Sequence, residues 1–176
     1  MASVPYVKDP APGTDLFRIF ETIRGRRGAV LNLYRVIANQ PAALEAFLEM
    51  SHYVRDRSSL STLFRELLIL VVANRLNEPY ELHQHQPLAL EAGASPEVLQ
   101  AIMQGDFAKF PARERAALQL VEALTDGKDA DPAMRDALVH FLPGELVDVV
   151  LTAGWYQLCA VVIRAFRIEP EGGGAQ

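Results

Sequence analysis

The stretch Leu67-Leu-Ile-Leu-Val-Val72, inside the segment of residues 60–76, decides the fold that this sequence predicts. An unbroken apolar run within a helix-length segment leaves no polar face, so we expect the helix that contains it to be buried on more than one side. The segment of residues 146–166 has the same character and is the second candidate for a central helix. Two such helices need others around them, which predicts a helical core.

Helix start signals recur along the rest of the chain, whereas the alternation of apolar and polar residues that is typical of strands is scarce. Ser95-Pro96 and Asp131-Pro132 each combine a capping side chain with a proline suited to the first helical turn, and Gln40-Pro41 opens another helix. We therefore predict an all-α fold. The helices are expected at residues 14–24, 29–38, 41–56, 60–76, 78–92, 95–104, 111–125, 131–140 and 144–166.

The length of 176 residues is that of one domain with a single sizeable core, which we place at residues 14–168. The flanking residues 1–13 and 169–176 are rich in proline, glycine and polar groups, so we expect them to be flexible tails. Half of the residues are hydrophobic, 22% are charged and the formal net charge is -5. This profile predicts a globular protein, and its acidic balance argues against a nucleic-acid partner because phosphates are bound by clustered Lys and Arg.

Targeting and redox signals are also scarce. The N-terminal residues have no apolar signal region, and no stretch reaches the roughly 20 apolar residues of a membrane span, so we expect a cytoplasmic protein without a membrane partner. Cys159 is the only cysteine, which excludes an intrachain disulfide, a Cys-x-x-Cys pair and a zinc cluster built on several cysteines. It lies in an apolar run, and we expect it to be buried.

The segment Glu78-Pro-Tyr-Glu81-Leu-His-Gln-His85 carries the candidate chemistry. On a helix, Glu78, Glu81 and His85 lie within about 60° of one another and share one face. An imidazole beside carboxylates can hold a movable proton near neutral pH. Glu66, at the start of the preceding apolar helix, completes a Glu–His pair if the two helices pack together. These residues predict an acid–base site.

The order and spacing of several short motifs resemble the carboxymuconolactone decarboxylase-like proteins, a superfamily that includes the alkylhydroperoxidase AhpD. The motifs are Leu31-Asn32-Leu33-Tyr34-Arg35, Gln40-Pro41, Arg65-Glu66-Leu67, Tyr80-Glu81-Leu82, His85, Ala89, Ala92-Gly93, Ser95-Pro96-Glu97 and Arg113-Glu114-Arg115-Ala116. The resemblance implies an AhpD-like helical domain, a multi-helix orthogonal bundle that assembles as a homo-oligomer, either a trimer or a hexamer. It also implies proton chemistry without a cofactor on a small acid or lactone.

The peroxidase branch of that superfamily uses a Glu, a Cys-x-x-Cys pair and a His as a thiol relay. In this sequence Glu66 and His85 match the Glu and the His, while Glu78 and Glu81 stand at the two cysteine positions. A carboxylate cannot attack a hydroperoxide or form a disulfide as a thiolate does. The resemblance therefore implies the branch without the cysteine pair, and no thiol peroxidase activity.

Three residues are our candidates for catalysis. We expect His85 to deliver a proton, Glu81 to raise the pKa of His85, and Glu66 to have its own pKa raised by burial and neighbouring carboxylates. Glu78, Tyr80 and Tyr34 are predicted to contact the substrate, although Glu78 also fits a helix start and Tyr80 a core position. Pro87 should kink or split the helix after His85, or mark a turn between two short helices.

These observations favour a cofactor-independent acid–base enzyme that decarboxylates or isomerises a small carboxylate or lactone. An anionic substrate would meet several carboxylates, and the candidates to neutralise it are Arg35, Arg65 and Arg75. One alternative is a non-catalytic ligand-binding or assembly module on the same fold. Another is a metal-dependent enzyme that uses the Glu and His cluster, although a single imidazole on that face is a poor match to a zinc or di-iron site. We predict no metal ligand.

Overall fold

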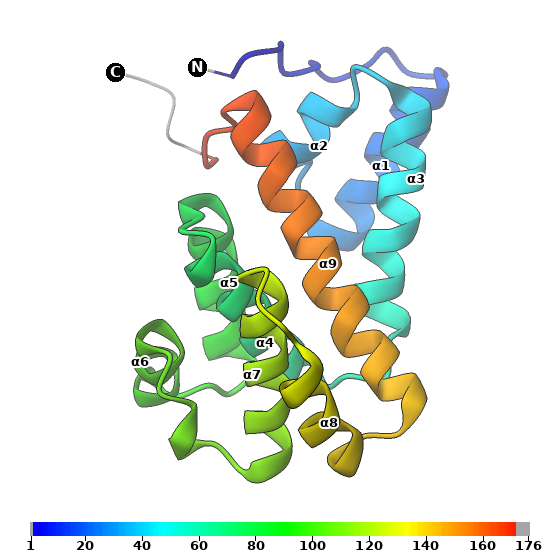
Figure 1. Cartoon of the computed structure of the whole chain (residues 1–176). Helices are drawn as coiled ribbons and strands as arrows, with labels where there is room; N and C mark the ends of the chain where they lie inside the picture. Colours follow the sequence, from blue (N-terminus) through cyan, green and yellow to red (C-terminus); the bar gives the residue numbers. More distant parts are fainter. Residues whose placement is uncertain (1, 172–176) are drawn as a thin grey trace. The chain divides into compact units, whose positions relative to one another are not determined.

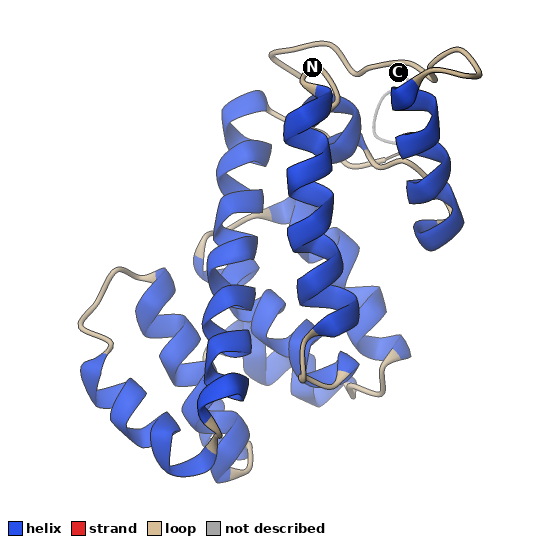
Figure 2. Ribbon diagram, turned by 90° about the vertical axis from the view of Figure 1, so that its right-hand side faces the viewer, coloured by secondary structure: helices blue, strands red, loops and turns tan. Residues whose placement is uncertain are grey.

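The computed structural model describes residues 2–171, and every regular element within that range is a helix (Figures 1 and 2). This confirms the all-α prediction. The largest boundary difference lies at residues 53–56, where a π-helix replaces the end of a predicted α-helix. The elements are α1 (Asp15–Arg27), α2 (Asn32–Ile37), α3 (Pro41–His52), the π-helix η1 (Tyr53–Arg57), α4 (Thr62–Arg75), α5 (Pro79–Glu91), α6 (Pro96–Gln104), the 3-10 helix η2 (Phe107–Lys109), α7 (Ala112–Thr125), α8 (Asp131–His140) and α9 (Pro143–Phe166).

Helix packing divides the chain into two compact units. The first is formed by residues up to Ser51 together with those from Val161 onward, and the second by residues His52–Ala160. Helices α1 to α3 enclose the core of the first unit. Its buried residues are Phe20, Ile23, Val30, Tyr34, Ala38, Leu44 and Leu48. Two compact units can still fold cooperatively as one domain. The single domain expected at residues 14–168 therefore stays a prediction.

The described ends of the chain are hydrogen-bonded within the first unit. Val7 donates its backbone N–H to the Arg35 carbonyl at 3.0 Å, and the backbone N–H of Glu169 donates to the Tyr6 hydroxyl at 3.1 Å. The flexibility expected for residues 1–13 and 169–176 stays a prediction. Residue 1 and residues 172–176 of those tails lie outside the described range.

Helix α4 is the centre of the second unit. All residues of 64–73 are buried, including the Leu67–Val72 run that the sequence marked as central. Helices α5, α6 and α7 all contact α4, and α8 contacts α7. Each buried aliphatic side chain of this size contributes about 1.5–3 kcal/mol of transfer free energy, so the apolar run is sufficient to hold α4 in the interior.

Helix α5 carries the candidate motif and begins at a side-chain cap. Glu78 stands at the N-cap position, where its Oε1 accepts a hydrogen bond from the Tyr80 backbone N–H at 3.2 Å. The sequence predicted a kink, split or turn at Pro87, but α5 runs from Pro79 to Glu91 without interruption. The split and the two short helices are therefore wrong, and a kink within α5 stays a prediction. Packing of α5 on α4 offsets the roughly 3 kcal/mol that an internal proline costs.

The π-helix η1 is anchored to α9 by one buried carboxylate. Asp148 of α9 accepts hydrogen bonds from the Tyr53 hydroxyl at 2.6 Å and from the backbone N–H and the hydroxyl of Ser59, both at 2.7 Å. The Ser58 N–H closes the π-turn on the Tyr53 carbonyl at 2.9 Å. Asp148 thereby holds both ends of the turn that carries Arg55.

Helix α9 is long and apolar enough to cross a membrane by length and composition alone, which our reading of the sequence did not anticipate. In the structure, 56% of the most apolar 18-residue stretch of α9 is buried inside the protein. A core helix of a folded domain passes the same test, so this feature is weak evidence for a membrane span.

Substituting Asp148→Ala should lower the free energy of unfolding by about 1–3 kcal/mol, because it removes the buried acceptor of the half-buried Tyr53 hydroxyl and of the two Ser59 donors. Chemical denaturation monitored by circular dichroism measures the loss. Asp136→Ala, which removes an exposed carboxylate on α8, is the matched control and should change stability by less than about 0.5 kcal/mol. Equal effects of the two substitutions would contradict the anchoring role.

Candidate acid–base site

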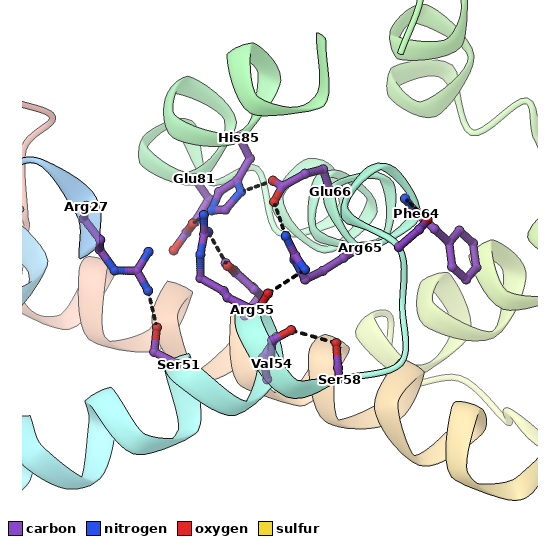
Figure 3. A network of polar contacts seen from close by, with 12 residues as sticks. Arg27, Ser51, Val54, Arg55, Ser58, Phe64, Arg65, Glu66, Glu81 and His85 are labelled. Atoms are coloured by element: carbon purple, nitrogen blue, oxygen red, sulfur yellow. Dashed lines mark hydrogen bonds and ion pairs between the residues drawn. The ribbon is translucent and has the colours of Figure 1, made fainter. Parts of the chain in front are cut away.

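Three of the predicted catalytic side chains meet inside the second unit (Figure 3). The Nδ1 of His85 lies 2.5 Å from the Oε2 of Glu66, and the Nε2 of His85 lies 3.2 Å from the Oε2 of Glu81. The exposed fraction is only 1% for Glu66 and 4% for both Glu81 and His85. The structure therefore brings together an imidazole and two carboxylates in a dehydrated environment.

Local sequence explains this convergence. Glu81 and His85 are one turn apart on α5, so their side chains lie on the same face. Glu66 belongs to the buried part of α4, which packs against α5. A carboxylate buried at that position is stable only with a charged or hydrogen-bonding partner, and His85 supplies it.

The two members of the pair shift each other's protonation. Burial raises the pKa of Glu66, but the hydrogen bond and positive charge of His85, with the charges of Arg55 and Arg65, outweigh it and leave that pKa lowered. Burial lowers the pKa of His85, but its hydrogen bonds to Glu66 and Glu81 outweigh that effect and raise it above the usual 6.5. Our expectation of a raised pKa for Glu66 was wrong, because neighbouring cations dominate, whereas the expected direction for His85 is confirmed.

The residues predicted to contact substrate have different surroundings. Glu78 and Tyr80 are both buried, and the carboxylate of Glu78 caps α5 through the Tyr80 N–H. Tyr34 belongs to the first unit, where its ring packs edge-on against Phe47 at 6.3 Å and beneath the guanidinium of Arg27 at 5.6 Å. Glu78 thus has the helix-start role that the sequence offered as its alternative, and the substrate contacts of all three residues stay predictions.

Of the three candidate arginines, one lies at the site. The Nη2 of Arg65 is 3.6 Å from the Oε1 of Glu66, and its Nη1 donates to the Arg55 carbonyl at 2.8 Å. Arg75 instead forms a double hydrogen bond with Asp126 at 2.7 and 2.8 Å. Arg35 lies in the first unit and is paired with Asp9.

Arg55 and Tyr156 also belong to the site, and neither was predicted as a site residue from the sequence. Arg55 on η1 donates to the Tyr156 hydroxyl at 3.4 Å, and the Tyr156 ring meets the His85 ring edge-on with centroids 5.0 Å apart. Burial raises the pKa of Tyr156, so its phenol stays protonated. Tyr156 lies in an apolar run that also contains the buried Cys159, and no sequence pattern distinguishes it from a core aromatic.

The donor set does not resemble a metal centre. Within residues 2–171, no group of three or more His, Cys, Asp and Glu side chains is arranged to hold a metal ion. Both ring nitrogens of His85 already face carboxylate oxygens. Neither nitrogen is therefore directed at a position where a metal ion could also bind other ligands. The arrangement is suited to holding a proton.

The comparisons agree with the fold. Residues 41–123 match the Carboxymuconolactone decarboxylase family. A peroxidase-related protein from Silicibacter sp. TM1040 superposes with a TM-score of 0.81 at 22% identity, covering 94% of this chain and 90% of its own. An AhpD-core, peroxidase-related protein from Ralstonia eutropha JMP134 gives 0.82 at 15% identity, covering 97% and 93%. No curated protein matches the sequence.

A third similar structure is that of a variant of the debrominase Bmp8 in complex with 2,3,4-tribromopyrrole, with a TM-score of 0.80 at 12% identity and coverage of 98% of this chain and 95% of that one. These similarities define the AhpD-like all-helical fold. The sequence motifs indicated a resemblance to the carboxymuconolactone decarboxylase-like superfamily, and the family match confirms this resemblance over residues 41–123.

The pairing of His85 with Glu66 should make the free energy of unfolding depend on pH. Because the pKa of His85 is raised, its contribution is complete below pH 6.5 and is lost as pH rises through the folded value. Because the pKa of Glu66 is lowered, its contribution is present above pH 4.5 and is lost as pH falls through the folded value. Denaturation at several pH values should show a Glu66-dependent stability maximum between these limits.

Glu66→Gln should remove that maximum and lower the free energy of unfolding by about 3 kcal/mol, since one partner of a buried pair is lost. The imidazole pKa of His85, followed by NMR, should fall in this variant. Glu91→Gln, which changes an exposed carboxylate at the end of the same α5, is the control and should leave both measurements unchanged. An unchanged pKa of His85 in Glu66→Gln would contradict the pairing.

Proposed function

We propose that this protein is a cofactor-independent acid–base enzyme of the carboxymuconolactone decarboxylase-like type, which decarboxylates or isomerises a small carboxylate or lactone. The observation that carries the proposal is the burial of His85 between the carboxylates of Glu66 and Glu81. The raised pKa favours the imidazolium form of His85, and an imidazolium in a dehydrated environment is an effective general acid.

The two His85 contacts differ in a way that suggests the direction of proton transfer. The shorter one, at 2.5 Å to Glu66, orients the ring and stabilises its positive charge. The longer one, at 3.2 Å to Glu81, is the side from which a proton can leave. In decarboxylation the carbon–carbon bond breaks, carbon dioxide departs and its bonding electrons form an enolate. The Nε2 proton then reaches the enolate carbon through the Glu81 carboxyl, and solvent returns a proton to His85.

Arg65 supports a substrate that carries a carboxylate. It is 6% exposed, and its Nε has no hydrogen-bond partner within the described part of the chain. A buried guanidinium N–H without an acceptor costs about 1–3 kcal/mol or more, so a bound anion would satisfy it. A cation at this position would offset the carboxylates that an anionic substrate meets.

Thiol peroxidase activity is not part of the proposal. The peroxidase branch needs a pair of cysteines, whereas Cys159 is the only cysteine of this chain and Glu78 and Glu81 hold the matching positions. The carboxylate of Glu81 faces His85, and that of Glu78 caps α5. A relay that moves protons in place of electrons is the chemistry that these side chains support.

We also propose that the protein is a cytoplasmic homo-oligomer, either a trimer or a hexamer. It acts on a small-molecule substrate and has no nucleic-acid or membrane partner. We expect light scattering coupled to size-exclusion chromatography to give a mass of three or six times 19.5 kDa. Large apolar side chains exposed on the second unit are consistent with such assembly. They are Leu90, Leu138, Val139, Leu142, Val147 and Leu158. A monomer at micromolar concentration would contradict this part.

His85→Gln should lower kcat by about 10²–10⁴-fold, because it removes the proton donor while keeping a polar side chain of similar size. Turnover is measured as a pH change with a panel of small lactones and of 2-keto and vinylogous acids, using the wild-type protein to identify the substrate. His83→Gln changes the exposed histidine of the same helix and should retain full activity. Undiminished turnover in His85→Gln would eliminate this mechanism.

The same substitution separates the alternatives. A non-catalytic binding module would show no turnover by wild-type protein, and His85→Gln would then leave ligand affinity unchanged. A metal-dependent enzyme would contain a metal after purification, which elemental analysis detects, and would lose activity on chelation.

Arg65→Gln should raise KM for a carboxylate substrate by about 10-fold or more with a smaller change in kcat, since the lost contact is a charged hydrogen bond worth roughly 1.5–3 kcal/mol. Arg65→Lys retains the charge and should recover part of the loss. Steady-state kinetics with an acid and its methyl ester make the test specific, because the ester should be indifferent to the substitution.

A further inference from the structure

The buried hydroxyl of Tyr156 has a proton that the structure does not use. Tyr156 is 4% exposed, and its one described polar contact is the Nη1 of Arg55 at 3.4 Å. A guanidinium can only donate, so the phenol oxygen is the acceptor in that contact. The phenol O–H itself has no acceptor among residues 2–171. Buried donors in folded proteins are nearly always satisfied, so this one points to a bound acceptor.

The surroundings of the hydroxyl define that acceptor. The Tyr156 ring stands edge-on to the His85 ring with an interplanar angle of 89°, and its hydroxyl lies within electrostatic range of Glu66 and Glu81. Because burial keeps the phenol protonated, it can donate but does not add a negative charge to a site that already has two. Arg55, by donating to the phenol oxygen, polarises the O–H bond and strengthens it as a donor.

We infer that Tyr156 donates a hydrogen bond to the substrate oxygen on which negative charge develops, with Arg55 as a positioning residue that polarises and orients its hydroxyl. The inference rests on the proposed function for the identity of that oxygen, which is the enolate oxygen formed when carbon dioxide leaves or when a carbon–hydrogen bond is broken. Tyr156 forms and breaks no covalent bond in this step. In the proposed reaction His85 supplies the proton that reaches the enolate carbon through Glu81, and Tyr156 stabilises the enolate oxygen.

The anchoring of η1 supports this assignment. Asp148 and Tyr156 both belong to α9, and both contact η1 through Tyr53 and Arg55 respectively. The Arg55 carbonyl also accepts from Arg65 of α4. Arg55 is therefore held from two helices, which is the support that a precisely oriented donor needs.

Tyr156→Phe tests the inference because it keeps the ring against His85 and removes only the hydroxyl. We expect kcat to fall by about 10²–10³-fold with little change in KM, as for loss of an oxyanion donor, and the NMR pKa of His85 to stay unchanged. Tyr6→Phe, which removes a hydroxyl of the first unit that accepts from the Glu169 N–H, is the matched control and should retain kcat. A large shift in the pKa of His85 in Tyr156→Phe would assign Tyr156 to support of the imidazole and overturn the inference.

A binding measurement keeps the test independent of turnover. Para-nitrophenolate, whose delocalised oxyanion imitates an enolate, is titrated by visible absorbance into wild-type protein, Tyr156→Phe and Tyr6→Phe. We expect equal affinity for wild type and Tyr6→Phe and at least about 10-fold weaker binding by Tyr156→Phe. Equal affinity in all three proteins, or no binding by wild type, would overturn the inference. Retained turnover in His85→Gln would contradict the role of His85 as proton donor. It would not affect the conclusion from the binding measurement on Tyr156.

Discussion

The ion pair between His85 and Glu66 is the contact on which the rest of the site depends. Burial alone would force a carboxyl to take up a proton and an imidazole to lose one, since each charge is costly away from water. Placed 2.5 Å apart, the two groups reverse both tendencies, and the pKa shifts of each are opposite to what desolvation would produce. The pair also joins α4 to α5. The protonation of the site therefore depends on the packing of these two helices.

The sequence predicts the part of this arrangement that lies within one helix. Periodicity alone places Glu81 and His85 on one face, and the apolar run in α4 alone predicts its burial. Contact between Glu66 and His85 depends on how two helices pack, which periodicity does not encode, and the family resemblance supplied it. The lowered pKa of Glu66 was missed for the same reason, because it follows first from the hydrogen bond and charge of His85 across the helix contact and then from the charges of Arg55 and Arg65.

Tyr156 and Arg55 could not have been found from spacing. A tyrosine in an apolar helix has the sequence pattern of a core residue, and the contact of Arg55 with Tyr156 joins the π-turn η1 to α9, which spacing does not predict. That turn is held by Asp148, far along the chain in α9. Pro87 shows the opposite error, since a strong local signal for a break was overridden by tertiary packing.

The side chain that faces the Nε2 of His85 limits the chemistry that the cluster can perform. Glu81 lies 3.2 Å from that nitrogen, and a carboxylate exchanges protons but no electrons. Two cations, Arg65 and Arg55, lie beside the cluster and offset its acids. The proposed reaction, in which an anion forms and is then protonated, suits a dehydrated cluster of this charge balance, because such a cluster stabilises the charge and already holds the proton.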